Sequence, residues 1–133
     1  MPFEEFKEKR GRGRYGFPVV TIMRSGGIGF NGEAHDAMGK PDRIVLAFDP
    51  ETRRIGLRGA KRNEYSHSYP IHSSSEHSMW VSGRSFLRYY DIVGESTTRY
   101  RAASGEGFLV IDLSEPPLRQ VRKKERGGDD AEG

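Results

Sequence analysis

The sequence predicts a mainly β protein with two short helices, in which two ββαββ-like half-domains pack as a pseudo-twofold small β-barrel. Two observations support this fold class. The 133 residues include 17 glycines and 7 prolines, which is typical of many turns and few long helices. In addition, one order of short strands, glycine turns and a short helix occurs twice along the chain, so we expect an internal duplication.

The first half spans residues 17–62 and begins with two strands joined by a glycine turn. The β-rich run 19–23 leads into Gly26 and Gly27, whose freedom to adopt a positive φ suits a tight turn. Residues 28–30 continue as the second strand. We therefore expect a short hairpin at the start of the folded core.

A short helix and a second hairpin complete this half. Asn31 is predicted to cap the helix, because its side-chain oxygen can accept a backbone N–H that lacks a partner. Gly39 and Pro41 end the helix. Residues 44–48 and 54–58 then pair across a polar turn. A unit this small cannot bury both sides of its hairpins, so it needs a partner.

The second half, residues 79–114, follows the same plan with low sequence identity. Its expected elements are a strand at 79–81, an N-cap at Ser82, a helix at 83–90, and strands at 99–103 and 108–113 that pair with each other. Two halves in one chain can bury their hairpin faces against each other, in place of a homodimer. The predicted core consists of Phe30, Phe48, Leu57, Trp80, Phe86, Leu87, Phe108 and Val110.

Charged or polar segments surround the two halves. Residues 1–16 are predicted to form a basic disordered arm, 63–78 a polar linker rich in serine and histidine, and 115–133 a charged disordered tail. Such arms either keep a small protein soluble or bind phosphates. The distribution of cations is therefore more informative than the net charge of +3.

Short motifs in the first half match the pattern of a known family. They are Val20-Thr21-Ile22, Gly26-Gly27-Ile28, Glu33, Met38-Gly39, Asp42, Ile44-Val45-Leu46 and Ile55-Gly56-Leu57-Arg58. Over this stretch the chain resembles the AbrB–MazE–SpoVT swapped-hairpin family of bacterial transcription factors and antitoxins, and its tandem arrangement is similar to MraZ-type members. The resemblance implies a cytoplasmic, nucleoid-associated DNA-binding protein. His35 and Asp36 stand where the family's helix usually carries an arginine.

Basic residues of the hairpins, the second helix and the N-terminal arm are the candidate DNA-binding residues. They are Arg10, Arg12, Arg14, Arg24, Arg53, Arg54, Arg58, Lys61, Arg62, Arg84 and Arg88. Guanidinium groups can bind phosphate bidentately, and such contacts position a protein on a duplex without reading its sequence. We therefore expect double-stranded DNA as the partner and a role in transcription regulation. Arg99 and Arg101, two apart on a strand, share one side of the sheet.

Three alternatives to duplex binding stay open. The arginines can form a solvated surface paired with carboxylates. Glu33 and Asp36 on the first helix would repel a duplex, and they suit a protein-interaction module of the antitoxin-like or scaffold kind, or a homo-oligomer. Trp80 and several tyrosines lie near arginines, an interleaving that can form a stacking platform for single-stranded nucleic acid.

Catalysis and cofactor binding find little support in the sequence. The chain has no cysteine, no G-x-S-x-G elbow and no P-loop, so we expect a protein that is not an enzyme and needs no cofactor. His67, His72 and His77 are five residues apart, a spacing that is neither helical nor alternating, so we expect no metal site. No apolar run approaches the length of a membrane span, and the acidic start does not resemble a signal peptide.

Overall fold

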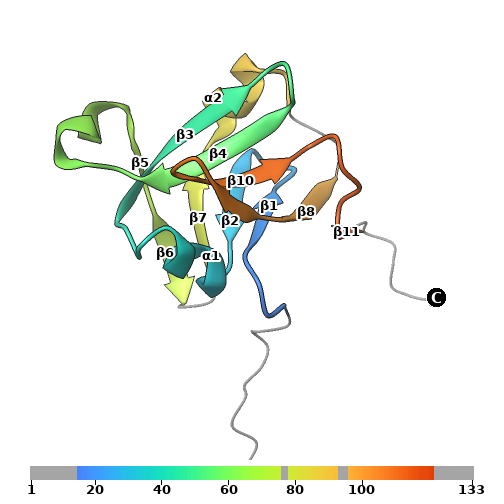
Figure 1. Cartoon of the computed structure of the whole chain (residues 1–133), viewed down its shortest axis with the longest axis horizontal. Helices are drawn as coiled ribbons and strands as arrows, with labels where there is room; N and C mark the ends of the chain where they lie inside the picture. Colours follow the sequence, from blue (N-terminus) through green and yellow to red (C-terminus); the bar gives the residue numbers. More distant parts are fainter. Residues whose placement is uncertain (1–14, 76–77, 93–95, 122–133) are drawn as a thin grey trace, which may run out of the picture.

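Two antiparallel β-sheets form the body of the protein in this computed structural model, which describes residues 15–75, 78–92 and 96–121 (Figure 1). The larger sheet has the strand order β11-β8-β1-β2-β7-β6, and the smaller has the order β5-β3-β4-β10-β9. The predicted mainly β class is confirmed. The strands are β1 (Val19–Ile22), β2 (Gly27–Phe30), β3 (Arg43–Asp49), β4 (Arg54–Gly59), β5 (Tyr69–Pro70), β6 (His72–Ser75), β7 (Ser78–Ser82), β8 (Thr97–Arg101), β9 (Ala103–Gly105), β10 (Phe108–Asp112) and β11 (Arg119–Val121). The helices are α1 (Gly32–Ala37), α2 (Arg84–Tyr89) and the 3₁₀ helix η1 (Arg62–His67).

The inner faces of the two sheets share one hydrophobic core. Side chains alternate between faces along each strand, so every second residue can be buried. In the smaller sheet Ile55 and Leu57 of β4 lie opposite Ile111 and Leu109 of β10, and all four are almost completely buried. The larger sheet contributes Val20, Ile28 and Val81, among others, to the same cluster.

The sheets do not close into the predicted barrel. Each sheet forms its own hydrogen-bonded ladder, and at two of the places where the chain passes between the sheets a single residue forms the corner. Ile71 separates β5 of the smaller sheet from β6 of the larger one, and Ala102 separates β8 of the larger sheet from β9 of the smaller one. Because the ladders are interrupted at these corners, the architecture is two facing sheets.

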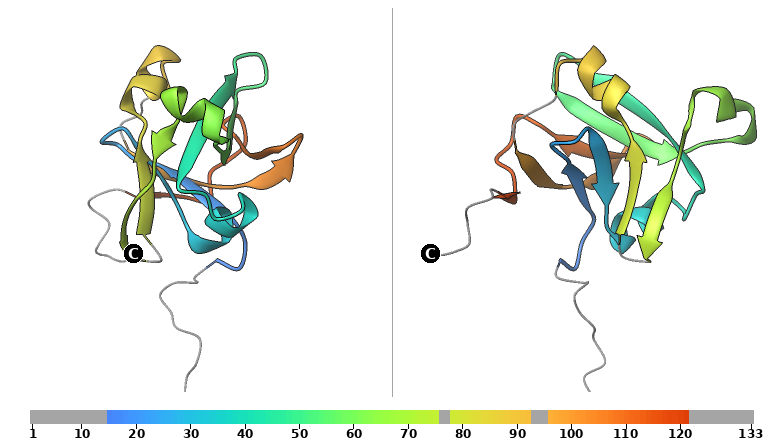
Figure 2. Two further views of the ribbon diagram at one scale, coloured as in Figure 1. Left: turned by 90° about the vertical axis from the view of Figure 1, so that its left-hand side faces the viewer. Right: turned by 180° about the vertical axis from the view of Figure 1, so that it is seen from behind.

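The predicted pseudo-twofold relation between the halves is visible in the strand pairing. β2 and β7, which each lead into a helix, pair antiparallel, with Gly29 opposite Trp80. β4 and β10, the last strands of the two predicted halves, also pair antiparallel, with Leu57 opposite Leu109. As a consequence, α1 and α2 lie at opposite ends of the body (Figures 1 and 2).

The local predictions for the first half are confirmed. β1 pairs with β2, and β3 pairs with β4. Asn31 caps α1, since its Oδ1 accepts a hydrogen bond from the Ala34 N–H at 3.0 Å. The same oxygen accepts from the Val19 N–H, and Nδ2 donates to the Phe17 carbonyl, both at 3.0 Å. One side chain therefore joins the start of β1 to the start of α1.

Two local predictions for the second half are wrong. The N-cap of α2 is Gly83 and not Ser82. A Cβ at Gly83 would lie 2.8 Å from Ile28 Cδ1, so close packing on β2 requires glycine there. The strand expected at 99–103 does not pair as a whole with 108–113. Its first part belongs to β8, which pairs with β1, and only β9 pairs with β10.

Three predicted core residues lie on the outer faces of the sheets. Trp80 is half-buried and alternates with Val81, which is fully buried in the core. Phe108 and Val110 are half-buried on either side of Leu109, which is the inward residue. The other predicted core residues do pack in the core or against it: Phe30, Phe48, Leu57, Phe86 and Leu87.

The segments predicted to be a linker and a tail also contribute strands. Residues 63–78 supply most of η1 together with β5, which pairs with β3, and β6, which pairs with β7. Within the predicted tail, residues 119–121 form β11 at the edge of the larger sheet. Residues 1–14 and 122–133, most of the predicted arm and tail, lie outside the described residues. No helix in the described ranges is long and apolar enough to cross a membrane.

Candidate nucleic-acid interface

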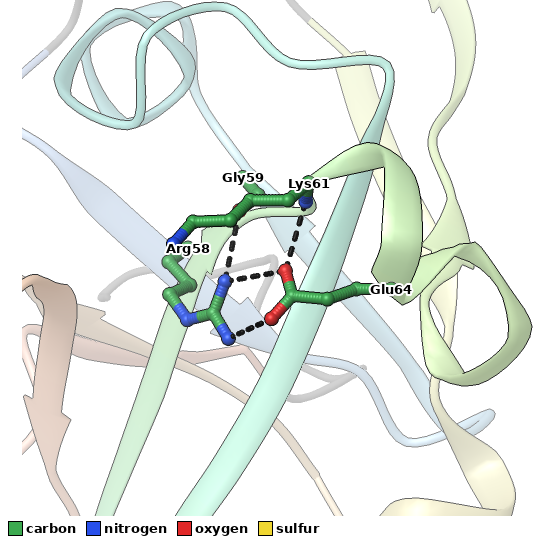
Figure 3. Close-up of polar contacts among 4 residues, drawn as sticks. All are labelled: Arg58, Gly59, Lys61 and Glu64. Atoms are coloured by element: carbon green, nitrogen blue, oxygen red, sulfur yellow. Dashed lines mark hydrogen bonds and ion pairs between the residues drawn. The ribbon is translucent and has the colours of Figure 1, made fainter.

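Arg58 forms an internal ion pair and is not available as a free cation. Its Nη1 and Nη2 donate to Oε1 and Oε2 of Glu64 at 2.8 and 2.7 Å, and the Lys61 N–H donates to the same Oε1 at 2.8 Å (Figure 3). These hydrogen bonds, that from Arg58 above all, lower the pKa of Glu64 from 4.5 to about 2. Hydrogen bonding to Glu64 likewise raises the pKa of Arg58. This pair fastens η1 to β4.

Arg54 is also paired, but less tightly. Its Nε lies 3.2 Å from Oδ2 of Asp112, on the neighbouring strand β10, and about half of its side chain (54%) stays exposed. The pKa of Asp112 is lowered mainly by hydrogen bonds from Ser114 and to a smaller extent by Arg54. Arg54 therefore joins the ends of β4 and β10 more than it adds to a positively charged surface.

Arg24, Arg84 and Arg88 gather around α2. Arg24 lies in the β1–β2 turn, two residues before Gly26, and a Cβ added to Gly26 would be 2.9 Å from Cβ of Arg84. The Arg24 N–H donates to Thr97 Oγ1 at 3.1 Å, which ties this turn to β8. All three arginines are exposed, and within the described ranges none of them forms an ion pair. We call Arg24, Arg84 and Arg88 the α2 arginine patch.

Arg53 approaches the other end of α2. It occupies the β3–β4 turn with a φ of +59°, and its guanidinium carbon lies 5.5 Å from the centre of the Phe48 ring. The Phe48 ring is in turn 4.7 Å from that of Tyr90, the residue that ends α2. Exposed carboxylates also lie on these segments, at Asp49 at the end of β3, Glu51 in the turn and Asp91 after the helix. The turn side of α2 is therefore of mixed charge.

The remaining candidates do not join this cluster. Lys61 and Arg62 are exposed at the start of η1, which projects beside β5 away from α2 (Figure 1). Arg10, Arg12 and Arg14 lie outside the described residues. The structure thus brings three of the eight described candidates together, leaves Arg53 beside them, places two on η1 and holds two in ion pairs.

The acidic helix α1 lies at the end of the body opposite α2 (Figure 1). Its exposed Asp36 pairs with Lys40 at 3.8 Å, and His35 Nε2 lies 2.9 Å from the Pro41 carbonyl oxygen. The carboxylates expected to repel a duplex are therefore remote from the α2 arginine patch. Among the described residues, no group of three histidines or acidic residues could hold a metal ion.

A second group of residues was not among the principal sequence candidates. On the outer face of the larger sheet, the rings of His72 and Trp80 are 5.6 Å apart. Arg99 and Arg101 project from β8 on the same face, and the Arg101 guanidinium carbon lies 3.9 Å from the centre of the Phe17 ring. The only sequence signals were the two-residue spacing of the arginines and the aromatic residues nearby. The strand order that joins them could not be read from the chain.

Comparisons with protein-family models, with curated proteins and with solved structures give no match to this chain. The resemblance to the swapped-hairpin family stays a prediction that rests on the motifs of residues 20–58. Any functional conclusion must therefore come from the site itself.

Proposed function

We propose that this is a non-enzymatic DNA-binding protein, a transcription regulator or accessory factor of the cytoplasm, that contacts the phosphates of a duplex through the α2 arginine patch. The observation that carries the proposal is the convergence of Arg24, Arg84 and Arg88 on one end of the body without ion pairs among the described residues. Unpaired guanidinium groups are well suited to bind phosphate oxygens bidentately.

The scaffold supports this role because it fixes the arginines relative to one another. Arg84 and Arg88 are four residues apart on α2, so they share one helix face. Phe86 and Leu87 on the opposite side of the helix are buried in the core, which anchors α2. The Gly26 contact places the β1–β2 turn against the start of the helix. Arginines on a rigid scaffold lose less entropy when they bind than arginines on a mobile loop would.

The positions of the acidic residues favour α2 over α1 as the contact surface. Glu33 and Asp36 belong to α1, at the far end of the body. A duplex at the α2 end would meet Arg84 and Arg88 first and would stay away from both carboxylates. On α1, which the protein-interaction alternative would use, Asp36 is paired with Lys40 at 3.8 Å.

The test is a fluorescence-anisotropy titration with a random-sequence duplex of about three helical turns, repeated from roughly 50 to 200 mM salt. We expect the double variant Arg84→Gln/Arg88→Gln to bind at least about tenfold more weakly and to reduce the log–log salt slope by about 2. The matched control is Lys61→Gln/Arg62→Gln, which removes the same charge from η1. Equal losses in both variants, or no duplex binding by the unmodified chain at low salt, would refute the proposal.

A further inference from the structure

The outer face of the larger sheet carries a continuous row of residues drawn from five strands. His72 of β6 lies opposite Trp80, Trp80 opposite Gly29, Gly29 opposite Thr21, and Thr21 opposite Arg99. Seen from behind, β1, β2, β7 and β6 lie side by side with no described helix laid across them (Figure 2). The row therefore runs from an aromatic pair at one side to an arginine at the other.

The charge of this face has one sign. None of the six strands of the larger sheet contains an aspartate or a glutamate. Arg99 and Arg101 are two residues apart on β8, so both project from the outer face. In the smaller sheet, by contrast, Asp49 and Asp112 lie within strands. The face of the larger sheet is thus complementary to an anionic ligand.

In the middle of the face β2 presents glycines outward, and the side chain of Met23 occupies the space beside them. A Cβ at Gly29 would lie 2.6 Å from Cε of Met23, and one at Gly27 would lie 3.0 Å from its Sδ. The flexible Met23 side chain therefore lies over β2 where larger outward side chains would otherwise stand. The other outward residues of β7 are Ser78 and Ser82, so Trp80 is the one large side chain that this strand presents on the outer face.

We propose that this face is a binding site for single-stranded nucleic acid, with bases stacked on Trp80 and His72 and phosphates held by Arg99 and Arg101. Aromatic rings on a positively charged sheet bind single strands because every base offers a face for stacking. Trp80 and Arg99 lie on strands three spacings apart, about 14 Å. That width accommodates an extended strand with its bases toward one side and its phosphates toward the other.

A single strand suits this surface better than a duplex does. The bases of a duplex are already stacked on each other, so the aromatic pair of His72 and Trp80 would gain no stacking partner there. The site uses different residues from the α2 arginine patch, which adjoins the larger sheet where the Arg24 N–H bonds to Thr97 Oγ1 of β8. The inference therefore goes beyond the proposed duplex contact and does not depend on it.

The chain's single tryptophan makes the test direct, because Trp80 is its own reporter. The full chain is titrated with an unlabelled oligothymidine of about 12 bases while its tryptophan fluorescence is measured. We expect saturable quenching that weakens with salt. The variant Arg99→Gln/Arg101→Gln, which keeps the reporter, should bind at least about tenfold more weakly. The matched control Lys61→Gln/Arg62→Gln, which removes the same charge from the exposed start of η1, should bind within about twofold of the unmodified chain.

A second variant examines stacking without relying on the reporter. Trp80→Leu, followed by anisotropy of a labelled oligothymidine, should lose about tenfold or more in affinity, since one stacked base is worth that much. Melting curves show that each variant is folded, and Arg99→Gln alone replaces the double variant if that one is not. The inference is overturned if the fluorescence of Trp80 does not respond, or if the Lys61/Arg62 variant loses as much affinity as the Arg99/Arg101 variant. It is also overturned if oligothymidine binds while both sheet variants behave like the unmodified chain.

Discussion

Gly26 in the β1–β2 turn and Arg84 at the start of α2 are in contact so close that a Cβ at residue 26 would be 2.9 Å from Cβ of Arg84. Gly26 also has a φ of +103°, a backbone conformation that residues other than glycine rarely adopt. Two independent features therefore require glycine at this position. The contact is what holds Arg24 near Arg84 and Arg88.

We expect Gly26→Ala to destabilise the fold by about 1–3 kcal/mol for the backbone conformation, with a further cost from the contact with Arg84. Gly39→Ala is the matched control, because Gly39 has a φ of +89° and nothing within 4 Å of the added Cβ. Urea unfolding of both variants separates the two costs. If Gly26→Ala costs no more than Gly39→Ala, the β1–β2 turn is not packed against α2 as described.

Adjacent residues of β10 should differ sharply in their contribution to stability. Leu109 is 2% exposed and faces the core, whereas Val110 faces outward and is half-buried. We expect Leu109→Ala to cost about 2–5 kcal/mol and Val110→Ala clearly less, because only the first leaves a cavity in the core. Chemical unfolding of the two variants measures the difference. A larger loss for Val110→Ala than for Leu109→Ala would mean that β10 is one residue out of register with β4.

The register of β10 illustrates what the sequence could not decide. The run Phe108 to Ile111 is apolar on both faces, so alternation did not show which residues point inward. Ile44, Leu46 and Phe48 in β3 are larger than Val45 and Ala47 between them, and Arg43 and Asp49 lie on the face of those smaller residues, so there the inward face was predicted correctly. Periodicity thus specifies a strand's orientation only where its two faces differ clearly in size or polarity.

Prediction of the candidate site from the sequence was limited by a different factor. Arg58 and Glu64 are six residues apart, but whether they pair depends on how η1 folds back on β4, which no local pattern records. The neighbours Trp80 and Gly29 are separated by about fifty residues of chain and meet only through the order of the strands. A list of arginines could therefore be read from the sequence, while their division into paired, clustered and sheet-face groups could not.

Asn31 should matter more than an ordinary helix cap. Its side chain bonds to the backbone of Ala34, Val19 and Phe17, so Asn31→Ala leaves three half-buried backbone groups without this partner. We expect a loss of about 2 kcal/mol or more, at the upper end for an N-cap. Asn31→Asp keeps the oxygen that accepts from Ala34 and Val19 and loses only the donor to Phe17. Its stability, measured by thermal unfolding, should therefore lie between that of the unmodified chain and that of the alanine variant. An alanine variant as stable as the aspartate variant would contradict this account.

The Arg58–Glu64 pair should make the stability of the fold depend on pH in the acid range. The pKa of Glu64 is lowered in the folded state, from 4.5 to about 2, so the folded protein holds the ionised form more strongly than the unfolded chain does. The resulting stabilisation is complete above pH 4.5 and is lost as the pH falls towards 2. We expect Glu64→Gln to lower stability at pH 7 and to flatten the fall in unfolding free energy between these limits, measured by urea titration at a series of pH values.

Asp112, whose pKa is also lowered, accounts for slope that remains in the variant. Glu51→Gln, at an exposed carboxylate outside the described ion pairs, is the control that removes the same charge. A pH profile of Glu64→Gln parallel to that of the unmodified chain would show that the ion pair contributes nothing to folding.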